Sequence, residues 1–321
     1  AYEGMRKNAF ETPSNPADYK DGMGRRALTS YLEYGYIPLE DGVSDAFHTK
    51  EQVSRTLEYA YDDFVLAQVA KALDKPEDYR VLMQRAANYR NVTDPRTGYA
   101  QGRHADGTFL NADNAFNFAR FITEGAPCHY TWYVPQDPYG LMECMGGKDN
   151  YISKLDSMFS EGRYWHGNEP CHQVAFMFNY AGQPWKTQRA VRHVMETEYL
   201  NASGGLSGND DAGQMSAWYM FAAMGFYPVC PGTPYYMLAS PSFPSLTLNL
   251  ENGNVFTVKA GNASEKNIYI QSATLNGKPY TRNYITHQDI LDGGVMEFVM
   301  GPEPNKEWGA RPEDCPPDVV E

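Results

Sequence analysis

Three acidic motifs are flanked by Gly or Pro, in positions where loops can aim carboxylates into a cleft. The first contains Glu124, which follows an apolar run and precedes Tyr130 and Trp132. Aromatic surroundings would remove water from the carboxylate and raise its pKa, which suits a general acid. The alternative is a loop carboxylate that only accepts hydrogen bonds from backbone amides. Trp132 is in addition a candidate sugar contact.

The second motif runs from Trp165 to Pro170 and contains Asn168 and Glu169. Asn and Glu side chains offer the hard oxygen ligands that Ca²⁺ requires, although the spacing is not that of an EF-hand. We therefore predict Asn168 and Glu169 as metal ligands and His166 as a substrate contact. The alternative is that these residues form an ordinary turn before a proline and bind no metal.

The third motif, Gly205–Gly213, places two adjacent carboxylates, Asp210 and Asp211, just before a predicted helix. Capping of the helix N-terminus would explain one of them. Two neighbouring anions repel each other, so catalysis or metal binding is an equally good explanation for the pair. Asn209 stands directly before them.

Together the three motifs suggest glycoside hydrolysis, with an acid, an opposing base and a cation that holds a polyol. An inverting enzyme keeps its two carboxyl groups about 6.5–9.5 Å apart so that a water molecule fits between base and sugar. The sequence does not supply that distance.

The motifs depend on helices that precede and separate them. The strongest helix signal follows Thr49, which has capping-box spacing to Gln52. An apolar stripe then recurs at helical intervals, formed by Val53, Leu57, Ala60, Phe64 and Ala67. Pro76 is predicted to open the next helix. Further helices are expected over 25–34, 150–160, 186–199 and 213–224, with Gly225 as the last C-terminal cap.

Helices joined by long loops, such as 91–149, suggest a helical barrel rather than a tight bundle. We therefore predict a mainly α chain with a helical-barrel domain over 1–230. Residues 231–321 are predicted to form a small antiparallel, β-sandwich-like domain. Its turns are expected at Asn252-Gly253, at Asn276-Gly277 and at 292–294.

The composition of the chain limits the kinds of molecule that it is expected to bind. The chain has 321 residues and a net charge of −13, which disfavours nucleic acid and anionic lipid. No stretch approaches the length of about 18 apolar residues that spans a membrane. Aromatic residues make up 14 % of the chain, a mild indication of a sugar site. No targeting signal is readable after Ala1, so the compartment has to come from function.

The five cysteines do not describe a disulfide-built scaffold. The usual zinc spacings are missing, and the Cys-His pairs at 128–129 and 171–172 are weak candidates because adjacent side chains diverge. A disulfide between Cys128 and Cys171 is a hypothesis, since both stand beside acidic motifs.

The motifs resemble those of glycoside hydrolase family 92. The similarity lies in the segment Gly208–Tyr219 with its continuation to Val229, and in Thr56–Asp63, Gly167–Pro170 and Tyr269–Ser272. It extends from about residue 20 to residue 308.

The resemblance implies a calcium-dependent, inverting exo-α-mannosidase acting on mannose-containing glycans, α-1,2-linked ones first. It also implies a secreted, periplasmic or cell-surface location. The family's fold is an N-terminal β-sandwich followed by an (α/α)6 barrel, so this chain would hold most of the barrel and would need the sandwich as its partner.

Carried over by position, Glu124 matches the general acid and Asp211 the general base. Asn209 stands where the family often has a supporting carboxylate. Asn168 and Glu169 match the calcium segment, while Glu58 and Asp210 are candidate sugar contacts. For Glu58 a buried cap or ion pair is the alternative. The residues after Gly125 depart from the family pattern, which puts the linkage preference in doubt.

Two rival functions remain at this stage. The chain could be a non-catalytic, mannan-binding fragment that needs the N-terminal sandwich for activity. A weaker rival is a helical-barrel hydrolase or lyase acting on acidic sugars, which the scarcity of Arg and Lys near the motifs disfavours.

Overall fold

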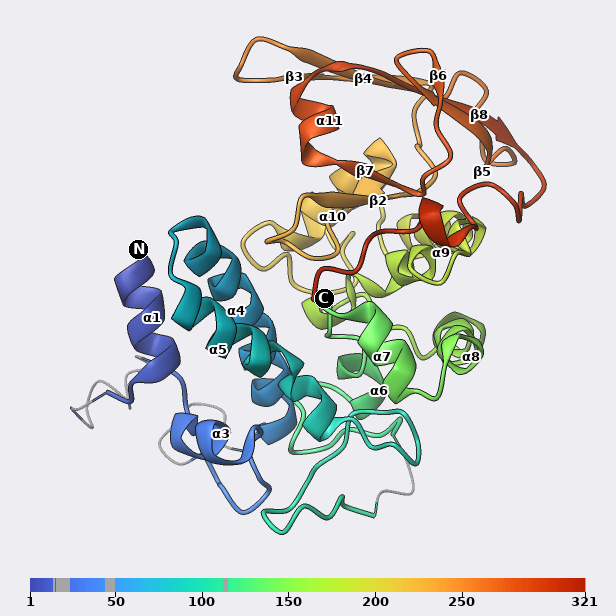
Figure 1. The fold of residues 1–321 in the computed structure, drawn as a ribbon. Helices are drawn as coiled ribbons and strands as arrows, with labels where there is room; N and C mark the ends of the chain where they lie inside the picture. Colours follow the sequence, from blue (N-terminus) through green and yellow to red (C-terminus); the bar gives the residue numbers. More distant parts are fainter. Residues whose placement is uncertain (14, 16–23, 44–49, 112–114, 321) are drawn as a thin grey trace. The chain divides into compact units, whose positions relative to one another are not determined.

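A computed structural model describes residues 1–13, 15, 24–43, 50–111 and 115–320. The chain folds into two compact units. Unit 1 comprises Ala1–Tyr151 with Val319–Glu321, and unit 2 comprises Ile152–Asp318. Figure 1 shows unit 1 as mostly helical, whereas unit 2 contains the strands.

Unit 1 is built around the helix α4 (Gln52–Ala72), which contacts α1 (Tyr2–Phe10) and α5 (Pro76–Ala86). The predicted apolar stripe is confirmed: every member, from Val53 to Ala67, is at most 1 % exposed. Pro76 opens α5 as predicted. Thr49 lies outside the described residues. The helix expected over 25–34 is α3 (Leu28–Tyr34).

An ionic cluster ties three helices together at the fully buried Asp63 of α4. Arg25 and Arg85 each place a guanidinium nitrogen 2.6 Å from its Oδ1, and the Tyr31 hydroxyl donates to Oδ2 at 3.0 Å. Two cations and a hydroxyl compensate the buried charge, which alone would be costly.

The stretch 91–149, predicted as loops, follows η1 (Ala87–Val92) and is interrupted by the short helices α6 (Pro127–Tyr130) and α7 (Pro138–Cys144). The helix expected over 150–160 is α8 (Lys148–Ser160). Isolated bridges, Thr93 to Ala100 and Arg103 to Phe109, stiffen the loop between η1 and α6.

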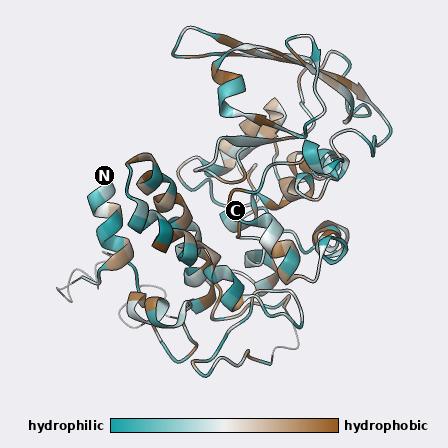
Figure 2. Cartoon of the chain, viewed as in Figure 1, coloured by the Kyte–Doolittle hydropathy of each residue, from teal (hydrophilic) through white to brown (hydrophobic). Residues whose placement is uncertain are grey.

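Unit 2 begins within α8 and continues through η2 (Glu169–Cys171), η3 (Val174–Asn179), α9 (Pro184–Thr197) and α10 (Gln214–Met224). Figure 2 shows α10 coloured as hydrophobic along most of its length, and its buried residues include Trp218. Gly225 ends α10 with a φ of 91°, which confirms the predicted glycine cap.

Two sheets complete unit 2. The first has the order β1 (Phe226–Tyr227), β2 (Tyr235–Leu238), β7 (Tyr284–Thr286). The second has the order β3 (Ser245–Asn249), β4 (Val255–Lys259), β8 (Gly294–Gly301), β5 (Tyr269–Leu275), β6 (Lys278–Pro279).

The hairpin predictions at Asn252-Gly253 and Asn276-Gly277 are confirmed, since they join the antiparallel pairs β3–β4 and β5–β6. The turn predicted at 292–294 is also present, but it does not join two antiparallel strands. These glycines follow the short helix α11 (His287–Leu291), and β8 then pairs parallel with β4. The crossover through α11 allows the parallel pairing, so the sheet is mixed rather than antiparallel.

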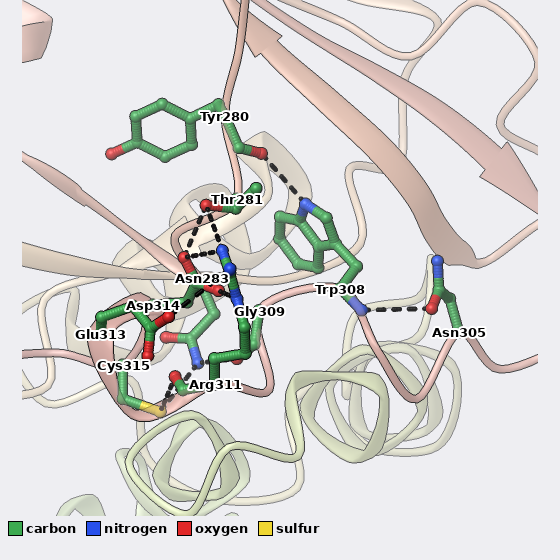
Figure 3. A network of polar contacts seen from close by, with 10 residues as sticks. All are labelled: Tyr280, Thr281, Asn283, Asn305, Trp308, Gly309, Arg311, Glu313, Asp314 and Cys315. Carbon is green, nitrogen blue, oxygen red and sulfur yellow. Dashed lines mark hydrogen bonds and ion pairs between the residues drawn. The ribbon is translucent and has the colours of Figure 1, made fainter.

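The C-terminal segment is fixed to β7 by a polar network (Figure 3). Asp314 accepts hydrogen bonds from Thr281 Oγ1 at 2.5 Å and from Arg311 Nε at 2.8 Å. The buried Asn283 donates from Nδ2 to the carbonyl of Gly309 at 2.8 Å. The Asn283 bond satisfies a backbone carbonyl, and the bonds from Thr281 and Arg311 satisfy the buried Asp314 carboxylate.

Several sequence-based predictions stay predictions. The described helices do not by themselves establish an (α/α)6 barrel, and the boundary after residue 230 is a hypothesis about domains rather than the division into the two units. Cys128 and Cys171 are buried thiols, one in each unit. No helix among the described residues is long and apolar enough to cross a membrane.

Candidate functional site

Glu124 occupies a tight loop of unit 1 in which its own φ is +50°, in the left-handed region. The Thr123 amide donates to Ser54 Oγ at 2.8 Å, and the Ala126 amide donates to His129 Nδ1 at 3.2 Å. Hydrogen bonds on both sides of Glu124 therefore hold a backbone conformation that a non-glycine residue rarely adopts.

The same loop is attached to the start of α4. The amides of Val53 and Ser54 donate to the Phe121 carbonyl at 3.0 and 3.3 Å, and the Glu51 amide donates to the Arg120 carbonyl at 3.0 Å. The first turn of a helix has amides without partners in the helix, and the loop before Glu124 satisfies three of them. Glu124 is thus positioned by the N-terminus of α4.

Glu58 lies one turn further along α4, half-buried and hydrogen-bonded to Tyr133. Burial raises the pKa of Glu58 to about 7, and the negative charge of Asp62 adds to the rise. Tyr130 joins the group through hydrogen bonds with Thr123 and Ser54, so Glu58 and the Glu124 loop belong to one connected cluster. In the described part of the chain the ion pairs next to Glu58 are formed by Asp62 and Asp63, and the ion pair considered as an alternative for Glu58 is not among them.

Two expectations for unit 1 need correction. Glu124 is exposed, so aromatic rings of the described residues do not shield its carboxyl from water. Trp132, predicted as a sugar contact, is fully buried and packs edge-on against Tyr151 at 5.2 Å. A tryptophan placed in the core has no surface to offer a sugar.

In unit 2 the two carboxylates of the third motif have different surroundings. Asp210 accepts hydrogen bonds from the Ser216 amide at 2.9 Å and the Ser216 hydroxyl at 3.0 Å, and thereby caps the start of α10. Asp211 is exposed and has a φ of +42°, and the next two residues, Ala212 and Gly213, also have positive φ. The capping explanation is therefore confirmed for Asp210. Asp211 makes no such cap and stands in a turn whose backbone is strained.

The loops of the second and third motifs touch through their backbones. A Cβ atom on Gly208 would lie 2.4 Å from the Gly167 carbonyl oxygen and 2.5 Å from the Gly167 Cα. Only two glycines allow such an approach. The contact places the segment that begins with Asn168 beside the segment that carries Asp211.

Asn168 and Glu169 are suited to a hard cation. Asn168 is only 8 % exposed, and the Oε1 atom of Glu169 is buried. Asn168 stands at the N-cap of η2 without a side-chain capping bond, so its amide oxygen is not committed to the helix. Both side chains offer oxygen donors of the kind Ca²⁺ selects. Among the described residues, no three His, Cys, Asp or Glu side chains gather at one point.

His166, predicted as a substrate contact, is fully buried beneath these loops and belongs to a hydrogen-bonded relay. The Tyr199 hydroxyl donates to the Met215 carbonyl at 2.9 Å, so it accepts from His166 Nε2 at 2.6 Å. His166 Nδ1 then accepts from the Tyr164 hydroxyl at 2.7 Å. Burial lowers the pKa of His166 to about 3, so the ring stays neutral and supports the start of α10 instead of touching a sugar.

Sequence reasoning missed the residues that connect these loops. His172 donates from Nε2 to the His166 carbonyl at 2.9 Å and receives a hydrogen bond from Gln214 at 3.3 Å. Trp218 donates to the His172 carbonyl at 2.9 Å. Gln214 and Trp218 are three to seven residues after Asp211, and that spacing within the same motif is a signal that could have found them.

Carboxylates on constrained loops beside oxygen donors are what a glycoside hydrolase needs, and comparison with known proteins gives the same class. Residues 1–302 match the family described as "Glycosyl hydrolase family 92 catalytic domain". The chain belongs to glycosyl hydrolase family 92.

Two solved structures from Bacteroides thetaiotaomicron are similar over nearly the whole chain. One is a family 92 α-mannosidase with 40% identity and a TM-score of 0.89, covering 99% of this chain and 41% of its own. The other is a family 92 inverting mannosidase with 37% identity and a TM-score of 0.89, covering 98% of this chain and 44% of its own.

A curated relative from Arthroderma benhamiae, described as an "Uncharacterized secreted glycosidase", is 31% identical over 346 residues. The match covers 99% of this chain and 44% of the relative. The chain thus spans less than half the length of the proteins it resembles.

Proposed function

We propose that this chain is the catalytic part of an inverting exo-α-mannosidase that removes terminal mannose from glycans with the assistance of Ca²⁺, with α-1,2-mannosides as the first substrate to test. Membership of family 92 supports the reaction class. The two solved relatives are an α-mannosidase and an inverting mannosidase, which supports the sugar and the stereochemistry.

The observation that carries the proposal is the loop around Asp211. A structural carboxylate would be expected to cap α10, and Asp210 already does so. Asp211 is left exposed in a strained turn, next to the loop of Asn168 and Glu169. Strain of this kind persists where function selects it, which supports Asp211 as a catalytic base.

In the proposed mechanism Glu124 protonates the departing glycosidic oxygen. Asp211 removes a proton from a water molecule, and that water attacks the anomeric carbon from the opposite face. The product leaves as β-mannose, because a single displacement inverts the configuration. Asn209, which is exposed beside Asp211, has no carboxylate with which to assist the base.

Asn168 and Glu169 would hold the calcium ion. When bound, Ca²⁺ would interact with mannose hydroxyls and help distort the ring towards its planar transition state. The chain's own contribution is to keep both oxygen donors in place, through the buried side of Glu169 and the backbone contact at Gly167.

The complete enzyme is proposed to contain an (α/α)6 barrel and an N-terminal β-sandwich, and to be secreted. The coverage of 41% and 44% of the two solved relatives leaves room for further domains. The curated relative's description as secreted supports the location.

The test is incubation of the chain with α-1,2-mannobiose, with and without EDTA, while NMR follows the anomers of released mannose. Release of β-mannose first, abolished by EDTA and restored by Ca²⁺, is the expected result. Release of α-mannose first would overturn the inverting mechanism, and release unaffected by EDTA would overturn the role of calcium.

If the chain alone releases no mannose, the full-length protein containing the N-terminal domain is assayed in the same way. Activity there would assign the chain to an enzyme that needs its partner domain. Binding of mannobiose without turnover by the full-length protein would replace the proposal with a glycan-binding function.

A further inference from the structure

Unit 1 has a surface pocket that the proposed mechanism does not use. It has a volume of about 610 Å³, within the range of small-molecule sites, which is roughly 300–1,000 Å³. The pocket is lined by Arg96, His104, Thr108, Phe109, Leu110 and Asn111.

The pocket is built on a rigid hairpin. The His104 amide donates to the Thr108 carbonyl at 2.8 Å, and the Gly107 amide donates to the His104 carbonyl at 2.9 Å. Arg103 connects the two sides of the hairpin. Its Nε donates to the Gly107 carbonyl at 2.9 Å, and its guanidinium carbon lies 5.1 Å from the centre of the Phe109 ring. A pre-organised wall of this kind lowers the entropy cost of binding a ligand.

Arg96 and Asn111 form one polar side of the pocket. Arg96 pairs with the buried Asp94, and its Nη1 donates to Asn111 at 3.1 Å. A guanidinium only donates hydrogen bonds, so the Asn111 atom facing Arg96 is its carbonyl oxygen. The Asn111 amide nitrogen is therefore turned away from Arg96, and Asn111 is exposed.

His104 forms another polar side. Its Nδ1 lies 2.6 Å from Glu40 Oε1, and the other carboxylate oxygen accepts from the Ala105 amide at 2.9 Å. An ionised carboxylate only accepts hydrogen bonds, so Nδ1 carries the proton and donates to Glu40. The pocket thus combines polar groups that donate or accept hydrogen bonds with the Phe109 ring.

The charges at the pocket are compensated. Among the six lining residues, the guanidinium of Arg96 is paired with Asp94, so it is not a free cation for a phosphate or a uronate. The six lining residues include no carboxylate, so a divalent cation lacks its usual ligands. An uncharged ligand with many hydroxyl groups matches such a surface, because each hydroxyl both donates and accepts.

We propose that this pocket is a carbohydrate-binding site that takes a short, uncharged stretch of oligosaccharide, with one sugar against Phe109 and its hydroxyls on Asn111, Arg96 and His104. The choice of a mannose oligomer as ligand rests on the proposed function. Binding here requires no hydrolysis, so the two proposals can be tested apart.

The test is a methyl-NMR titration of the full chain with α-1,2-mannotriose, in an Asp211→Asn background that prevents turnover. Leu110 lines the pocket, so its methyl resonances report binding there. They are expected to shift with saturation. Phe109→Ala and Asn111→Ala are each expected to raise the Kd by about fivefold, the effect of losing one hydrogen bond or ring contact.

Phe243→Ala is the matched control, because it removes an aromatic ring that is 53% exposed on the surface of unit 2. It is expected to leave the Leu110 titration unchanged. If Phe109→Ala disturbs the hairpin, the exposed Asn111→Ala still decides the question. Leu110 resonances that do not move, or variants that both keep the parental Kd, overturn the pocket proposal whether or not the unsubstituted chain hydrolyses mannobiose.

Discussion

Gly208→Ala tests whether the contact between the second and third motifs positions the catalytic base. The new Cβ would lie 2.4 Å from the Gly167 carbonyl oxygen, whereas ordinary contacts begin at 3.4 Å. The two backbones must therefore separate by about 1 Å, the difference between these distances. A displacement of about 1 Å near a reacting group can cost about 10²-fold in rate.

The expected result is a kcat for mannobiose that falls by about 10²-fold, since Asp211 follows on the displaced loop. The crowding should also lower the free energy of unfolding by about 1–3 kcal/mol. Steady-state kinetics and thermal unfolding measure the two effects separately. The unfolding measurement remains informative even if the chain needs its partner domain for activity.

Gly204→Ala is the control in the same loop. A Cβ there meets no atom within 4 Å, and neither Gly204 nor Gly208 has a positive φ. The two substitutions therefore share the change in backbone entropy and differ in the steric contact. If Gly208→Ala behaves like Gly204→Ala in both measurements, the reasoning about the contact is refuted.

Further changes probe individual groups. Glu124→Gln and Asp211→Asn should each lower kcat on mannobiose by at least about 10²; kinetics near the wild-type level would remove the residue from its role. Asp210→Ala should lower the free energy of unfolding by about 0.5–2 kcal/mol through loss of the Ser216 cap, while Asp210→Asn should retain most of it; equal melting temperatures would contradict capping. Glu58 has its pKa raised from 4.5 to about 7, so its contribution to stability is full below pH 4.5 and is lost as pH rises towards 7. That loss is up to about 3 kcal/mol, and a Glu58→Gln variant that kept the same pH slope in urea titrations would contradict the assignment. Removal of Ca²⁺ should lower the melting temperature, and Mg²⁺ should not restore it; identical curves would argue against a calcium site in this chain.

Helix positions could be predicted because their signals are local. The apolar stripe from Val53 to Ala67 determines which face of α4 is buried, and Pro76 and Gly225 mark a start and an end. The turn at 292–294 was predicted, but the antiparallel arrangement of the strands around it was not correct. The sequence carries no local sign that the following strand pairs parallel with a strand 38 residues earlier.

Burial at the site was less predictable than residue type. Trp132 and His166 are aromatic residues beside acidic motifs. From the sequence alone, residues of these types could either stack against a sugar or pack in the core beneath the site. The structure gives both a place in the core: Trp132 packs against Tyr151, and His166 has ring partners in His172 and Trp218. Which of two adjacent carboxylates caps a helix also depends on backbone geometry, which the pair Asp210-Asp211 does not reveal.

Backbone strain gives a separate argument for the two predicted catalytic residues. Most non-glycine residues with positive φ stand at element boundaries, as Glu51 does before α4 and Asn276 does in a hairpin. Their strain is explained by the turn they make. Glu124 and Asp211 have φ of 50° and 42° although they are exposed and have long or charged side chains, for which this conformation costs about 1–3 kcal/mol.

In both loops, neighbouring residues supply the hydrogen bonds that hold the strained backbone. Thr123 and Ala126 hold the loop around Glu124, and Asp210 holds the loop before α10. The carboxylates themselves are left to point outward. A loop that uses its neighbours for structure and exposes its carboxylate is the arrangement expected when the carboxylate has to meet a substrate, and the two predicted catalytic residues, Glu124 and Asp211, both stand in such a loop.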